Sequence, residues 1–77
     1  MSQEYGMYAI YDELTEQYGA PVIFLNDKVA LKSWKTFVSS KKSEEIEGQH
    51  FVRIGSYIME SGEVINLENN QVIIWKK

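Results

Sequence analysis

The stretch NDKVALKSWKTFVSS, residues 26–40, decides the fold class, because it carries one helical pattern with a clear start. Asn26 is a good N-cap, and Asp27 follows in the first turn, where a negative charge is favourable to the helix dipole. Apolar residues then recur at the helical period, and they are Ala30, Leu31, Trp34, Phe37 and Val38. The pattern predicts an amphipathic helix that ends near Ser39 or Ser40.

The other side of this helix is basic, although the chain is acidic overall. The sequence has 11 Asp and Glu against 8 Lys and Arg, for a net charge of -3. Five of the basic residues lie in and just after the helix, and they are Lys28, Lys32, Lys35, Lys41 and Lys42. The first three, at i, i+4 and i+7, share one helical face. This local field would suit contacts with nucleic-acid phosphates. The alternative is an ordinary solvated outer face, which is the rule for amphipathic helices.

The rest of the chain predicts strands separated by turns. They are Met7–Tyr11, Val22–Leu25, Gln49–Ile58, Glu63–Leu67 and Gln71–Trp75. Pro21 has no amide donor for a ladder, which favours an edge position for the second strand. Turn signals occur at residues 60–62 and at Asn69 and Asn70. The prediction is a single α+β domain, residues 1–77, with a small antiparallel β-sheet and one amphipathic helix packed on one face, in the order β-β-α-β-β-β.

The strand Gln49–Ile58 raises a question about its two faces. Alternation puts Val52, Ile54 and Ile58 on one face and Phe51, Arg53, Gly55 and Tyr57 on the other. If the helix covers the first set, two aromatic rings flank a cation on an open face. Single-stranded nucleic acid needs rings for base stacking and cations for its backbone, whereas exposed aromatic patches also mark protein interfaces. The sequence leaves open whether this face packs under the helix, contacts another subunit, or contacts DNA through Phe51, Arg53 and Tyr57.

Catalytic and metal-binding motifs are missing from the sequence. It has no cysteine and no Gly-rich phosphate loop, and His50 is its only histidine. We therefore expect no enzyme activity, no cofactor, no metal site and no small-molecule substrate. The acidic groups at residues 12–16 and 44–47 lie in polar connectors, where carboxylates are ordinarily solvated.

Size and hydropathy set two further expectations. A chain of 77 residues buries only roughly 60% of its unfolded surface, and this one has neither a disulfide nor a metal to add stability. We therefore expect a homo-oligomer. The longest apolar runs, Val22–Leu25 and Val72–Trp75, are too short to span a membrane, so we expect a soluble, cytoplasmic protein without membrane contact.

Several short motifs occur together in an order that resembles a known family. Residues 8–12 read YAIYD, residues 18–21 read YGAP and residues 26–30 read NDKVA, whereas residues 53–57 read RIGSY and residues 61–65 read SGEVI. The series resembles the small non-structural protein of gokushovirus-type microviruses, phages with single-stranded DNA genomes. That family shows a YSIYD opening, a middle segment with PF, ND and A.R.F, and an IG.FD..TG.I hairpin.

Three departures accompany this resemblance. Lys32 stands near the place of the family's arginine, Tyr57 and Ile58 replace an aromatic-Asp pair, and Asn69–Lys77 has no counterpart. The resemblance implies a role in single-stranded DNA genome synthesis or packaging through DNA binding, with single-stranded DNA favoured over double-stranded DNA. The alternative is a module that binds a host or phage protein without contacting DNA.

Overall fold

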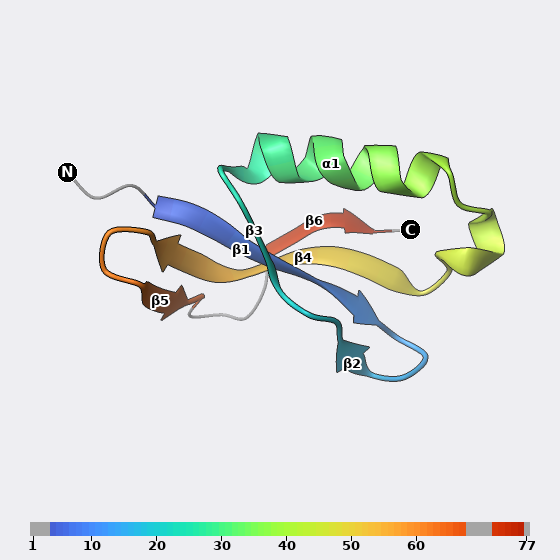
Figure 1. Cartoon of the computed structure of the whole chain (residues 1–77). Coiled ribbons are helices and arrows are strands. Elements are labelled where there is room, and N and C mark those ends of the chain that lie inside the picture. Colours follow the sequence, from blue (N-terminus) through green and yellow to red (C-terminus); the bar gives the residue numbers. More distant parts are fainter. Residues whose placement is uncertain (1–3, 68–71, 77) are drawn as a thin grey trace.

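One α-helix packs on one face of a curled antiparallel sheet in the computed structural model, which describes residues 4–67 and 72–76 (Figure 1). The elements are β1 Glu4–Asp12, β2 Gln17–Tyr18, β3 Val22–Phe24, α1 Asp27–Ser39, the short 3-10 helix η1 Ser43–Glu45, β4 Gln49–Ile58, β5 Glu63–Asn66 and β6 Val72–Lys76. The predicted α+β class is confirmed. No helix in the described ranges has the length and apolar content needed to cross a membrane.

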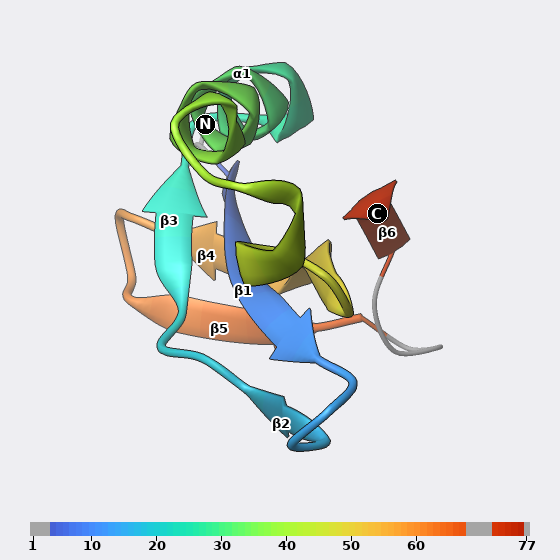
Figure 2. The same ribbon diagram turned by 90° about the vertical axis from the view of Figure 1, so that its right-hand side faces the viewer.

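The long strands β1 and β4 form the centre of the sheet. They pair antiparallel from Glu4 opposite Ile58 to Asp12 opposite Gln49. The outer edge of β1 is shared by β2 and β3, and the outer edge of β4 is shared by β5 and β6. Seen end-on, this arrangement curls around the β1–β4 pair, with α1 on one side (Figure 2). The sequence missed β2, and the turn predicted at residues 69–70 lies outside the described residues.

The predicted helix is confirmed at both ends. The side-chain oxygen of Asn26 accepts a hydrogen bond from the Val29 amide at 2.9 Å, which satisfies one of the first free amides of α1. At the other end, the amide of Ser40 donates to the carbonyl of Phe37. Ala30 and Trp34 are buried against the sheet, so the apolar side of α1 faces the core as its periodicity indicates.

The core is a stack of three aromatic rings that joins α1 to the two central strands. The ring of Phe51 lies between Tyr8, at 5.4 Å, and Trp34, at 5.1 Å, and it is nearly parallel to both. All three side chains are buried. Each stacked pair adds about 0.5–1.5 kcal/mol beyond the burial of apolar area. We refer to the sheet face that carries this stack as the helix-covered face.

A β-bulge in β4 changes which side chains share a face. Met7 pairs with Gly55 and Tyr8 pairs with Arg53, so Ile54 is an extra residue without a partner in β1. The bulge shifts the alternation of β4 by one residue. Phe51 and Arg53 lie on the helix-covered face, whereas Gly55 and Tyr57, beyond the bulge, lie on the other face. The alternation predicted through the whole of β4 is therefore wrong from Ile54 onward.

A glycine is required at this bulge for steric reasons. A Cβ atom added to Gly55 would lie 2.5 Å from the backbone carbonyl oxygen of Ile65 in β5. The close approach of β5 to β4 therefore depends on a residue without a side chain at position 55. This position directly follows the bulge, so one glycine serves both the bulge and the pairing with β5.

Replacing Phe51 should test the ring stack. We expect Phe51→Ala to lower the free energy of unfolding by about 3–5 kcal/mol, because it leaves a cavity between Tyr8 and Trp34. Chemical denaturation followed by circular dichroism measures the change. Leu14→Ala serves as the control, since that side chain is 83% exposed and should cost far less.

Should Phe51→Ala fail to fold, Phe51→Leu keeps most of the side-chain volume and should cost about 1 kcal/mol. Equal losses in Phe51→Ala and Leu14→Ala would contradict the assignment of Phe51 to the core.

Candidate nucleic-acid interface

Lys28, Lys32 and Lys35 lie on the side of α1 that is turned away from Trp34. All three are exposed, and within the described residues no ion pair joins any of them to a carboxylate. They span about 10 Å along the helix axis at 1.5 Å per residue. The structure thus presents a short row of unpaired cations, which we call the lysine row.

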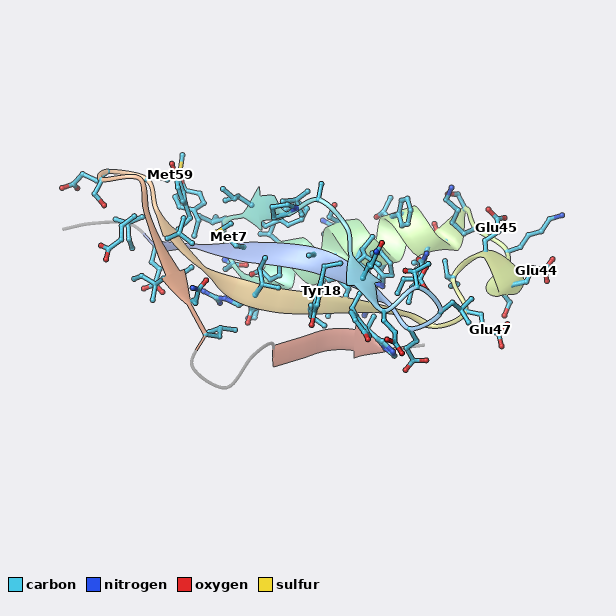
Figure 3. All side chains as sticks on the ribbon, turned by 90° about the horizontal axis from the view of Figure 1, so that it is seen from below. Met7, Tyr18, Glu44, Glu45, Glu47 and Met59 are labelled. Atoms are coloured by element: carbon cyan, nitrogen blue, oxygen red, sulfur yellow. The ribbon has the colours of Figure 1, made fainter. Side chains whose placement is uncertain are left out.

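Lys41 and Lys42 follow the end of α1 and are less free than the lysine row. The Lys41 ammonium lies 5.1 Å from the centre of the Phe37 ring, a distance at which cation–π attraction acts. Lys42 precedes η1, and its backbone amide donates to a Glu45 side-chain oxygen at 3.1 Å. Figure 3 shows Glu44, Glu45 and Glu47 gathered at this end of the molecule. Carboxylates therefore border the basic surface directly after Lys42.

Phe51 is not available for stacking on a base. Its side chain is 3% exposed and is held between the rings of Tyr8 and Trp34. A base could reach it only if α1 left the sheet. Of the alternatives for Phe51, packing under the helix is the one that the structure shows, and the prediction that Phe51 contacts nucleic acid is wrong because its ring is part of the core.

Arg53 is also committed to interactions within the fold. Its guanidinium donates to Asp27 at 2.9 Å, to the Ser56 hydroxyl at 2.9 Å and to the Gly55 carbonyl at 3.1 Å. A Glu4 carboxylate oxygen lies 4.0 Å away. The side chain is only 21% exposed. Arg53 therefore joins the start of α1 to β4 and has little capacity left for a phosphate.

Tyr57 lies on the opposite face of the sheet, away from Phe51 and Arg53. It pairs across strands with Tyr5, and Tyr11 pairs with both Tyr18 and His50. The Tyr11 and Tyr18 ring centres are 4.8 Å apart, and those of Tyr11 and His50 are 6.2 Å apart. We name this surface the tyrosine face, and it consists of Tyr5, Met7, Tyr11, Tyr18, Ile23, Tyr57 and Val64. Met7 and Tyr18 are visible on it in Figure 3.

The sequence analysis missed the tyrosine face, although a signal for it exists. Residues 5, 7, 9 and 11 of β1 are all apolar or aromatic at period two, which is typical of one face of a strand. Tyr18 could be found only from tertiary structure, because β2 is too short to show alternation. His50 lies at the edge of this face, where its Nε2 atom contacts a Glu13 carboxylate oxygen at 2.7 Å.

An apolar hollow of about 210 Å³ lies between α1 and the edge strand β3. Its wall is formed by Ala9, Ile10, Ala20, Val22, Phe24, Ser33, Trp34, Phe37 and Phe51. Ser33 is the only polar side chain in that set, so the hollow offers packing rather than acid–base chemistry. Among the described residues, no three His, Asp or Glu side chains converge in a way that would hold a metal ion.

A hydrogen bond at the start of α1 fixes the helix to the sheet. The Tyr8 hydroxyl donates a hydrogen bond to an Asp27 carboxylate oxygen at 2.5 Å. The same oxygen also accepts a hydrogen bond from Arg53. Burial raises the pKa of Tyr8 well above its usual range, and the hydrogen bond and negative charge of Asp27 raise it further. Tyr8 is therefore neutral and a hydrogen-bond donor at every physiological pH.

Comparison with known proteins gives one match. The family model described as Phage ORF5 protein matches residues 5–76. This match includes most of the C-terminal segment that had no counterpart in the motif resemblance. Neither the curated proteins nor the solved structures contain a match to the chain.

Removal of the Tyr8 hydroxyl should weaken the attachment of α1. We expect Tyr8→Phe to lower the free energy of unfolding by about 1–2 kcal/mol at neutral pH, because the bond to charged Asp27 is lost. Urea denaturation gives this value. Tyr18→Phe is the matched control. Because Tyr18 is half-exposed, loss of its hydroxyl should leave the free energy of unfolding unchanged.

The same pair of variants should differ in alkaline solution. The pKa of Tyr8 is raised on folding, so its contribution is fully present below the unfolded pKa of about 10 and is lost as pH rises above that value. The wild type should therefore lose stability more steeply above pH about 10 than Tyr8→Phe does. Identical slopes for these two proteins would contradict the assigned role of Tyr8.

Proposed function

Because the match over residues 5–76 means that the chain belongs to the family of Phage ORF5 proteins, we propose that it is a phage accessory protein that binds single-stranded DNA through the lysine row. It acts without enzyme activity, in the cytoplasm of the infected bacterium. The motif resemblance to microvirus non-structural proteins favours a role in single-stranded genome synthesis or packaging.

The observation that carries this proposal is the unpaired state of the lysine row. Three exposed ammonium groups lie within about 10 Å along one side of a helix, close enough together to contact neighbouring phosphates of one strand. A flexible single strand can follow such a narrow row. Because an α-helix also fits a major groove, the preference for a single strand over a duplex rests on the motif resemblance.

The charge of the whole protein does not prevent this contact. The net charge of -3 opposes approach of a polyanion, but its effect is screened beyond a Debye length of about 8 Å at physiological ionic strength. Direct contacts between ammonium groups and phosphates act over shorter distances. Binding should thus be of modest strength and depend strongly on salt.

Neutralising the lysine row gives the test. We expect the triple variant Lys28→Gln, Lys32→Gln, Lys35→Gln to lose binding to oligo(dT), measured by fluorescence anisotropy, while its circular dichroism stays unchanged. If the wild type makes three to five phosphate contacts, the logarithm of its binding constant should fall with the logarithm of the salt concentration with a slope of roughly -2 to -3.5. Exposed lysines contribute little to folding, so stability should change by less than about 0.5 kcal/mol.

A control with the same change in net charge separates local contact from general repulsion. Thr15→Glu, Gln17→Glu and Asn66→Asp are exposed substitutions away from α1, and together they lower the net charge by the same amount. This control should keep most of the DNA affinity. Equal loss in both triple variants would show that no specific row exists, and absence of salt-sensitive binding by the wild type would refute DNA association.

A second candidate function is binding of a protein partner without DNA. The carboxylates next to Lys42 and the acidic balance of the chain favour it, because they weaken attraction for a polyanion. In this case the lysine row is a solvated surface, and neutralising it changes neither DNA binding nor stability.

A further inference from the structure

We propose that the tyrosine face is the interface of a homodimer, in which two sheets pack face to face and each α1 lies on an outer side. This proposal does not rest on DNA binding. It concerns the surface opposite to the lysine row and commits to a second copy of the chain as the occupant.

The cross-strand register shows how continuous this surface is. Val64, Tyr57 and Tyr5 form one row across β5, β4 and β1. Ile23 and Met7 form a second row across β3 and β1. Tyr18, Tyr11 and His50 form a row at the other end of the sheet. Ala9 and Val52 pair with each other between these rows and are buried, at 2% and 4% exposure, so the exposed apolar side chains lie toward the two ends of the face.

No described helix packs on this surface. In Figure 1 α1 lies on the other side of the sheet, and Figure 3 shows the strands in front of α1 when the molecule is viewed from the uncovered side. Val64 is 50% exposed, Tyr18 48% and Ile23 43%. A sheet ordinarily buries each apolar face against a second layer. The tyrosine face has its apolar side chains in place, but within the described residues it lacks that layer.

Charge favours a second copy over a nucleic acid on this face. The face carries no Lys or Arg from residues 4–67, since Arg53 points to the helix-covered face and bonds to Asp27. Carboxylates occur in the turns at its two ends, with Glu13 and Glu16 at one end and Glu60 at the other. Stacked bases here would bring phosphates close to these carboxylates without compensating cations.

The size of the chain favours a second copy as the occupant. A chain of 77 residues without a cysteine has no disulfide to add stability, and a domain this small commonly gains stability by association.

The acidic ends give the dimer a salt dependence of its own. Face-to-face packing brings the carboxylates of two copies near one another at the rim, so screening of their repulsion should strengthen association. Higher salt should therefore tighten the dimer, whereas it weakens binding of DNA to lysines. The opposite signs allow the two proposals to be tested separately in one set of buffers.

The test compares two neighbouring residues of β3 whose side chains lie on opposite faces. Ile23 pairs with Met7 on the tyrosine face and Val22 pairs with Tyr8 on the helix-covered face, and their exposures are 43% and 45%. Sedimentation velocity of the full chain over a concentration series, at low and high salt, measures self-association. Circular dichroism checks that each variant is folded.

We expect the wild type to approach twice its mass of 9.0 kDa with increasing concentration, and to do so at lower concentration in high salt. The Ile23→Glu variant should remain a monomer, with its self-association constant reduced at least tenfold. Val22→Glu should associate as the wild type does. Should Ile23→Glu be unfolded, Tyr18→Ser at the far end of the face replaces it and should weaken the dimer several-fold.

Three outcomes would overturn the proposal. The first is a wild type that stays monomeric at all concentrations and both salts, and the second is loss of association in Val22→Glu but not in Ile23→Glu. The third is a monomeric wild type whose binding to oligo(dT) is abolished by Ile23→Glu, which would make the face a base-stacking surface. Failure of the lysine row to bind DNA leaves the dimer result unaffected.

Discussion

The attachment of α1 to the sheet through Tyr8 is the interaction on which the rest of the structure depends. The Tyr8 ring stacks on Phe51, and its hydroxyl bonds to Asp27 in the first turn of the helix. One side chain thus fixes both the depth of the helix above the sheet and the position of its N-terminus. A buried hydroxyl would be costly without a partner, so the bond to Asp27 strongly disfavours other placements of α1.

The same attachment decides which groups are available for function. Asp27 also accepts from Arg53, so the cation nearest to the core serves the fold. Phe51 is likewise occupied by Tyr8 and Trp34. The exposed lysines of α1 remain on one side of the molecule and the tyrosine face lies on the other. Because of this separation, no strand face of the described residues combines cations for phosphates with aromatic rings for bases.

The sequence was informative where a local pattern specifies the structure. The cap at Asn26 and the periodicity of α1 predicted the helix to within a residue, and alternation located β4. The extra residue at Ile54 could not be read from alternation, because a bulge is defined by pairing with another strand. That single residue placed Tyr57 on the opposite face from Phe51 and Arg53, so the three predicted residues do not share one strand face.

The two proposed surfaces are coupled through the layer order of the dimer. Face-to-face sheets place one helix on each outer side, so two lysine rows point away from each other and are separated by about 30 Å if each layer adds about 10 Å. Because a strand must pass around the dimer and not through it, one molecule can reach both rows only if its length well exceeds this separation. Shorter strands occupy each row independently, and only longer ones gain from the raised effective concentration of the second row. Dimerisation through the tyrosine face would thereby turn a weak, narrow row of lysines into a binder that selects long single strands.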